Sequence, residues 1–136
     1  MLVQLLEIST RQYGGHAVVA LRGELDLAGA SGLRDRLRTA CERNAGRVAL
    51  DLTDLTFIDS TGLSILVEYH DKARAAGGRL ILVAPRAAVL RILDITGLDE
   101  RLTICDRIEQ VPDEAVVRDV EESVTGPPPR AEEAEV

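Results

Sequence analysis

Aromatic residues and cysteines are scarce in this chain of 136 residues. It has no tryptophan, two tyrosines, one phenylalanine and two cysteines. Its core must therefore be filled mainly by Leu, Val, Ile and Ala. Cys41 and Cys105 lie on apolar patterns without a partner at metal-ligand spacing, so we interpret both as small buried hydrophobes. His16 and His70 also lack a companion that would make them ligands or catalytic bases, and we expect no metal site and no cofactor.

Long apolar runs and basic clusters are missing as well. No run of about 18 apolar residues occurs, and the amino terminus has no basic region followed by an apolar one. The formal net charge of −7 is concentrated near the carboxyl terminus, because residues 113–136 hold eight acids and two arginines and leave −1 for the rest. The sequence has no basic stripe for nucleic acid or for an anionic membrane. These features predict a soluble, cytoplasmic protein that binds another protein.

Apolar patterns along the chain alternate between the periods of strands and helices. Strands are predicted at residues 4–10, 17–22, 48–52, 80–83 and 103–105. Helices are predicted from after Asp26 to Asn44, from Ser60 to about residue 76, from Pro85 in a first turn to Gly97, and from Pro112 onward. Strands that alternate with helices form mostly parallel sheets. We therefore predict an α/β fold with a mixed, mostly parallel sheet of about four to five strands and about four helices.

The chain is long enough for one domain and too short for two ordinary ones. We assign residues 1–120 to that domain. Residues 121–136 contain three consecutive prolines and several glutamates without apolar periodicity, which predicts a disordered, acidic, Pro-rich tail.

The segment between the third strand and the second helix is the most informative part of the chain. A short turn is expected after the strand, followed by Asp59, Ser60, Thr61 and Gly62 at the start of the helix. Asp59 and Ser60 are both good N-cap residues, and the first backbone N–H groups of a helix can bind an anion. A phosphate on Ser60 would lie in the positive field of the helix. The simpler interpretation is that these residues only cap the helix.

The rest of that helix has an apolar pattern that predicts its orientation. Residues at three- and four-residue steps form the predicted buried face, namely Leu63, Leu66, Val67 and Ala73. Ile65 and Tyr69 lie four residues apart and are expected on the outer face, as apolar contacts for a partner or partly buried under a neighbouring loop.

Four ordered segments resemble the STAS domain of anti-sigma factor antagonists. They are residues 48–63, residues 23–26 (Gly-Glu-Leu-Asp), residues 77–80 (Gly-Gly-Arg-Leu) and residues 93–98 (Leu-Asp-Ile-Thr-Gly-Leu). The resemblance covers about residues 4 to 118. In that family the serine directly after the aspartate is phosphorylated, which implies Ser60 here.

The resemblance also implies a partner-switching function in transcription regulation. The unphosphorylated protein would bind an anti-sigma factor that is a serine kinase and thereby release a sigma factor. Phosphorylation of Ser60 would stop this binding, and a phosphoserine phosphatase would restore it. The kinase would supply ATP and magnesium. The expected partner-binding residues lie at one edge of the sheet and on the second helix, namely Asp26, Asp59, Ser60, Thr61, Gly62, Ile65 and Tyr69.

Two other functions are compatible with parts of the sequence. An enzyme with Ser60 as nucleophile is disfavoured, because the chain lacks a Gly-x-Ser-x-Gly turn, a His partner and a phosphate-binding Gly-rich loop. We therefore expect no catalytic residues. The closer alternative is a non-catalytic STAS scaffold in a signalling assembly, either unphosphorylated or phosphorylated on Thr61.

Overall fold

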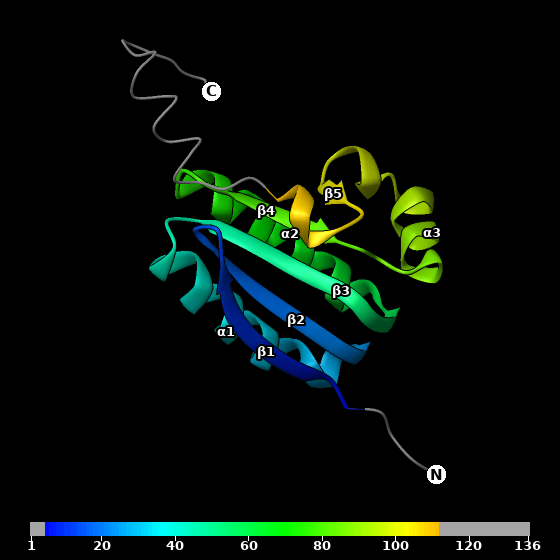
Figure 1. Ribbon diagram of the computed structural model, residues 1–136. Helices are drawn as coiled ribbons and strands as arrows, with labels where there is room; N and C mark the ends of the chain where they lie inside the picture. Colours follow the sequence, from blue (N-terminus) through cyan, green and yellow to red (C-terminus); the bar gives the residue numbers. More distant parts are fainter. Residues whose placement is uncertain (1–4, 112–136) are drawn as a thin grey trace.

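The computed structural model describes residues 5–111 and contains one five-stranded sheet with the strand order β1-β2-β3-β4-β5. β1 pairs antiparallel with β2, and the other neighbours are parallel. The strands are β1 (Glu7–Tyr13), β2 (His16–Leu25), β3 (Arg47–Ile58), β4 (Arg79–Val83) and β5 (Thr103–Cys105). The prediction of a mixed, mostly parallel sheet is therefore confirmed (Figure 1).

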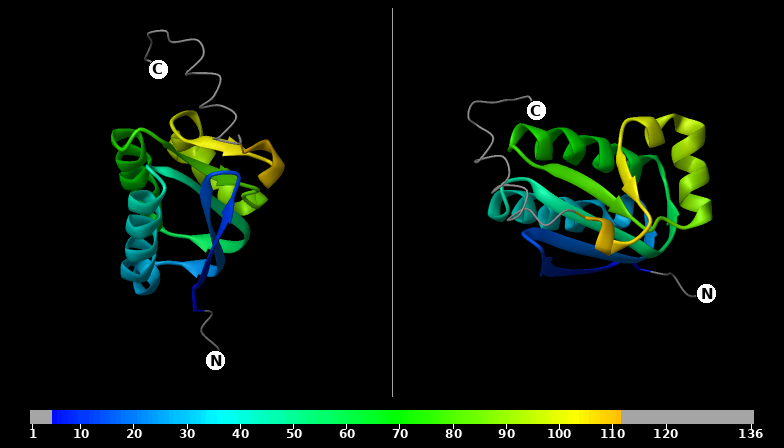
Figure 2. Two further views of the ribbon diagram at one scale, coloured as in Figure 1. Left: turned by 60° about the vertical axis from the view of Figure 1, so that its left-hand side comes forward. Right: turned by 45° about the horizontal axis from the view of Figure 1, so that its top comes forward.

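The described residues also form three α-helices and three short 3-10 turns. The helices are α1 (Ala30–Arg43), α2 (Ser60–Ala75) and α3 (Ala87–Thr96), and the turns are η1 (Leu27–Gly29), η2 (Leu98–Glu100) and η3 (Ile108–Gln110). Figures 1 and 2 show α1 and α2 side by side on one face of the sheet. The helix predicted from Pro112 and the tail predicted from residue 121 lie outside the described residues.

The main core lies between the sheet and the helices. Buried leucines and valines of β2, β3 and β4 join the buried faces of α1, α2 and α3 in one cluster. Leu33, Leu37, Ala40 and Cys41 of α1 belong to it, and the burial of Cys41 was predicted. Val18, Ala49, Ile81 and Val83 belong to a smaller cluster, because side chains alternate between the two faces of a strand.

β3 is longer than predicted. The sequence pattern placed its end at Leu52 and a turn before Asp59, but the strand continues to Ile58. Its second half pairs with the end of β2, with register shifts that let both Leu52 and Leu55 face the core. Thr53 and Asp54 are exposed, so their polarity is compatible with a strand at this position.

The predicted orientation of α2 was partly wrong. Leu66 and Ala73 are buried, but Leu63 and Val67 are only half-buried. Ile65 and Tyr69, expected on the outer face, have exposed fractions of 0% and 3%. The reason is that α2 packs against α1 as well as against the sheet, so its buried surface is wider than one stripe. Ile65 and Tyr69 consequently offer no surface to a partner.

Smaller predictions had mixed outcomes. Gly97 ends α3 in the left-handed conformation with φ 78°, as expected. Pro85 precedes Arg86, the N-cap of α3, and so lies outside the first helical turn where it was predicted. Cys105 is half-buried, whereas the sequence pattern predicted full burial.

No helix in the described part of the chain is long and apolar enough to cross a membrane.

Candidate functional site

The carboxyl ends of β2 and β3 bring two acidic residues together. Leu25 is the last residue of β2 and pairs with Ile58, the last residue of β3. Asp26 and Asp59 follow these paired residues directly. The backbone N–H of Asp59 donates a hydrogen bond of 3.1 Å to the carbonyl oxygen of Leu25, so the pairing extends one residue beyond the strand. The two acids therefore leave the sheet at the same edge, as the parallel arrangement predicted.

Asp59 is the N-cap of α2. Its backbone is extended, and its Oδ1 accepts a hydrogen bond of 3.0 Å from the backbone N–H of Gly62. Its carbonyl oxygen accepts the first helical bond, from Leu63 at 3.0 Å. Of the two predicted N-cap candidates, Asp59 thus takes this position and Ser60 becomes the first helical residue.

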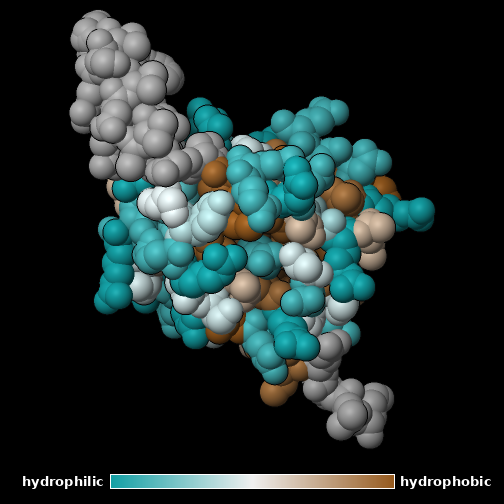
Figure 3. Space-filling model, viewed as in Figure 1, coloured by the Kyte–Doolittle hydropathy of each residue, from teal (hydrophilic) through white to brown (hydrophobic). Residues whose placement is uncertain are grey.

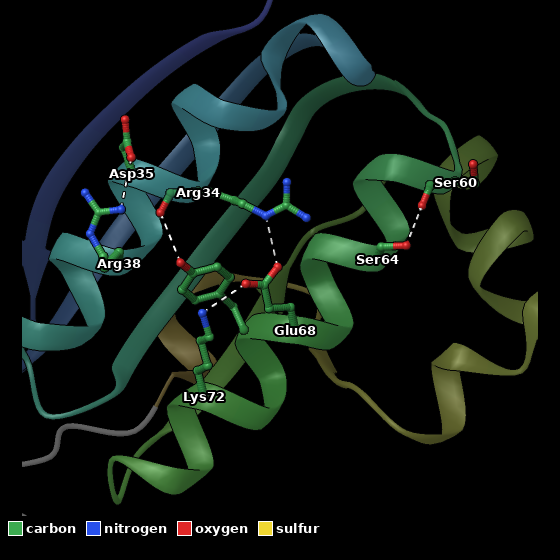
Figure 4. A network of polar contacts seen from close by, with 8 residues as sticks. Arg34, Asp35, Arg38, Ser60, Ser64, Glu68 and Lys72 are labelled. Carbon is green, nitrogen blue, oxygen red and sulfur yellow. Dashed lines mark hydrogen bonds and ion pairs between the residues drawn. The ribbon is translucent and has the colours of Figure 1, made fainter.

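Ser60 is exposed at the start of α2, and Thr61 is half-buried. The carbonyl oxygen of Ser60 accepts a hydrogen bond of 3.0 Å from the hydroxyl of Ser64, one turn further along α2. In Figure 4 the Ser60 hydroxyl points away from this bond and away from the polar contacts between α1 and α2. The hydroxyl is therefore accessible, and it lies at the positive end of the helix dipole.

Gly62 permits the first turn of α2 to lie directly on the strand ends. A Cβ atom at this position would be 2.7 Å from Cγ1 of Ile58 and 2.8 Å from Cγ of Leu25. Any side chain would therefore force a shift of the Ile58 and Leu25 side chains or of the first turn of α2. The absence of a side chain at Gly62 thus positions the neighbouring hydroxyls. Gly62 itself is buried and has no accessible surface for a partner.

Asp26 is the N-cap of the turn η1. Its Oδ1 accepts a hydrogen bond of 3.1 Å from the N–H of Ala28, and its carbonyl oxygen accepts one of 3.1 Å from Gly29. Within residues 5–111 neither Asp26 nor Asp59 takes part in an ion pair. Both acids are half-buried, so this edge carries negative charge that reaches solvent.

Two exposed apolar residues beside these acids were missed in the sequence analysis. Leu27 directly follows Asp26 and is 75% exposed, and Phe57 lies two residues before Asp59 and is 45% exposed. Leu27 could have been noticed, because it lies in the short segment between a strand and a helix. Phe57 gave no such indication, because it is part of an apolar strand pattern.

The middle of α2 forms a polar network with α1. Glu68 accepts hydrogen bonds from Nζ of Lys72 at 2.9 Å and from Nε of Arg34 at 3.0 Å (Figure 4). These two hydrogen bonds lower the pKa of the Glu68 carboxyl, and the bond from Lys72 has the larger effect. The Tyr69 hydroxyl donates to the carbonyl oxygen of Arg34 at 3.2 Å. These contacts hold α2 against α1 and explain why Tyr69 is not available to a partner.

The two histidines lie far from Ser60. His70 is ten residues further along α2, which corresponds to about 15 Å of helix. His16 begins β2, whereas Ser60 lies beyond the carboxyl end of that strand, about 30 Å away along its length. Neither histidine can accept a proton from the Ser60 hydroxyl. The residues that the structure describes also contain no group of three His, Cys, Asp or Glu that could hold a metal ion.

Comparisons with known proteins agree with this arrangement. The family model described as STAS domain matches residues 7–111. The anti-sigma-B factor antagonist of Bacillus subtilis (strain 168) is 30% identical over 104 residues, which cover 76% of this chain and 94% of that protein. The anti-sigma F factor antagonist of Paenibacillus polymyxa is 29% identical over 102 residues, covering 74% and 87% respectively.

A solved structure has the same fold. The crystal structure of an anti-sigma factor antagonist from Mycobacterium paratuberculosis aligns with a TM-score of 0.72 at 25% identity. The alignment covers 85% of this chain and 96% of that one. The similarity therefore extends over nearly the whole of the solved chain.

Proposed function

This chain belongs to the STAS domain family, and from that premise we propose that it is an anti-sigma factor antagonist controlled by phosphorylation of Ser60. In the unphosphorylated state it binds an anti-sigma factor that is also a serine kinase, and the sigma factor is released. In the phosphorylated state it no longer binds. The chain acts by binding and performs no catalysis.

The exposed hydroxyl of Ser60 at the start of α2 is the observation that carries this proposal. A kinase needs an accessible hydroxyl, and Ser60 is exposed whereas Thr61 is half-buried. A phosphate adds roughly two negative charges, which the start of a helix tolerates without loss of the fold. Its charge is then added to that of Asp26 and Asp59.

The added charge is the physical basis of the switch. A partner that docks on an edge bearing two carboxylates needs a surface of complementary charge and shape. A phosphate on Ser60 changes both, because it occupies the surface between the partner and the first turn of α2. The kinase thus no longer binds the phosphorylated edge, while the rest of the domain is unchanged.

ATP and magnesium belong to the kinase in this proposal. A separate phosphoserine phosphatase removes the phosphate and restores the binding-competent form. No group on this chain needs to activate the Ser60 hydroxyl, which agrees with the distance of both histidines from it. The same edge could serve a STAS scaffold phosphorylated on Thr61, but the lower exposure of Thr61 favours Ser60.

The proposal is tested by incubating the full chain with each anti-sigma factor kinase of its host, ATP and magnesium. We expect one phosphate per chain, located on Ser60 by peptide mass spectrometry. Ser60→Ala should abolish labelling, and the matched control Thr61→Ala should be labelled like the wild type. Full labelling of Ser60→Ala would overturn the assignment, and loss of labelling only in Thr61→Ala would support the scaffold.

A further inference from the structure

Exposed apolar side chains gather around the carboxyl edge of the sheet. Within residues 5–111 five large apolar residues are exposed, and three of them are Leu5, Leu27 and Phe57, with exposed fractions of 71%, 75% and 45%. We name these three residues the apolar rim. In Figure 3 hydrophobic surface reaches the solvent at the lower end of the view, where the chain enters β1.

The strand register places the apolar rim beside Ser60. Phe57 pairs with Glu24, one residue before the pair Leu25 and Ile58 that ends the two strands. Glu7 of β1 pairs with Arg22 in antiparallel orientation, so the preceding residues run toward the carboxyl end of β2. Leu6 lies against Gly29 of η1, where a Cβ atom would be 3.0 Å from its Cδ2. Leu5 and Leu27 therefore belong to neighbouring segments.

Leu27 is held in place although its side chain is exposed. Its turn is fixed by hydrogen bonds from Ala28 and Gly29 to Asp26, and its own carbonyl oxygen accepts from Ala30 at the start of α1. Because the backbone is already fixed, a partner that covers Leu27 has to order only its side chain. Burial of a leucine side chain also gives one of the larger gains available from a single residue. Leu27 thus has the properties of an apolar anchor.

The charge around the apolar rim limits what can cover it. Glu24, Asp26 and Asp59 lie along the same two strand ends, and none of them has an ion pair within the described residues. A second copy of this chain would place these acids against their own counterparts. An anionic membrane would repel them in the same way. A protein surface that combines apolar groups with Arg or Lys side chains is complementary to both features.

We propose that the apolar rim, with Leu27 as its anchor, is the docking surface for the kinase, and that the kinase presents an apolar patch bordered by basic side chains. This inference rests on the function proposed above. The apolar rim supplies most of the affinity, and the acids beside Ser60 make binding sensitive to phosphate. Docking and phosphate transfer are then separate properties, because Leu27 contacts the kinase without touching the Ser60 hydroxyl.

The test uses full chains and the kinase that labels Ser60. Leu27→Gln makes the anchor polar, and Leu27→Met is the matched control that keeps it apolar. Leu27→Gln should raise the Kd for the kinase, and the KM for phosphorylation of Ser60, by about tenfold or more, with an unchanged kcat. Leu27→Met should stay within about twofold of the wild type. Thermal unfolding should be the same for all three proteins, because the side chain is exposed.

A position control uses Ile95 on α3, which is also 75% exposed but outside the apolar rim. Ile95→Gln should leave Kd and KM within about twofold of the wild type. The inference would be overturned if Leu27→Gln bound the kinase like the wild type, or if Ile95→Gln lost as much affinity as Leu27→Gln. Either result would leave the proposed switch at Ser60 intact. A wild-type dimer dissolved by Leu27→Gln would assign the rim to self-association instead. Failure of every kinase to label Ser60 would overturn both proposals.

Discussion

The first turn of α2 and its middle have opposite properties, although both belong to one helix. The first turn carries the exposed Ser60 and the glycine Gly62, and it is capped by Asp59, which has no ion pair within residues 5–111. The middle carries Glu68 and Tyr69, which both form hydrogen bonds with Arg34 of α1, and Lys72, which donates to Glu68. In the function proposed above, the first turn changes its charge without loss of the fold, whereas the hydrogen bonds of the middle hold α2 against α1. We therefore propose that partner-dependent chemistry is confined to the end of the helix.

Of the substitutions predicted here, Gly62→Ala should have the largest effect, because it disturbs the packing of the first turn of α2 on the strand ends. The new Cβ would lie within 2.9 Å of Ile58 and Leu25, so we expect a loss of about 1–3 kcal/mol in the free energy of unfolding. Chemical denaturation measures this loss. Gly32→Ala in α1 is the matched control, because the nearest atom to its Cβ is 4.0 Å away, and it should stabilise the protein by about 0.5–1 kcal/mol. If Gly62→Ala left the free energy of unfolding unchanged, the close contact at Gly62 would not be responsible for the position of Ser60.

Tyr69→Phe addresses the middle of α2. It removes the hydrogen bond to Arg34 and should lower the free energy of unfolding by about 0.5–1.5 kcal/mol. Because Tyr69 is buried, affinity for the kinase should be unchanged once the fold is intact, as measured by calorimetry. A selective loss of kinase binding with normal stability would show that the middle of the helix does take part in docking.

His70 makes the middle of α2 sensitive to acid. Burial lowers its pKa below the ordinary value of 6.5, and the positive charges of Arg74, Arg101 and Arg79 act in the same direction while Asp71 opposes them. The folded state thus prefers the neutral imidazole, so its stabilisation is complete above the unfolded pKa and is lost as the pH falls through the folded pKa.

The thermal midpoint should therefore decrease when the pH is lowered from 7.5 to 5.5. His70→Leu should make this decrease smaller by a modest amount. Scanning calorimetry of both proteins at the two pH values measures the difference. An identical fall in the variant would show that His70 is not the group responsible.

The sequence predicted the sheet edge well because parallel strands must end on the same side. This rule brought Asp26 and Asp59 together before any side chain was located, and capping preferences placed the start of α2 within one residue. The orientation of α2 was less predictable. Ile65 and Tyr69 are buried because α1 lies beside them, and the helical period of α2 alone does not contain that contact.

The second half of β3 and the exposure of the apolar rim were missed for related reasons. Polar residues such as Thr53 and Asp54 interrupt the apolar pattern, yet they continue β3 because they face solvent. Exposure of Leu27 and Phe57 depends on which segments surround them, so an apolar residue in the sequence is equally consistent with a core position. Local patterns thus predicted the elements and the capping residues, whereas tertiary contacts decided which surfaces remain accessible.

The most direct test of the switch compares the affinity of two forms of the same chain for the kinase. Protein phosphorylated stoichiometrically on Ser60 and unphosphorylated protein are titrated with the kinase in calorimetry, with Ser60→Ala as the control that cannot be modified. Because phosphate adds charge to the edge that carries Asp26 and Asp59, we predict a Kd at least about tenfold higher for the phosphorylated form, with Ser60→Ala close to the unmodified protein. Equal affinity of the two forms would contradict the account.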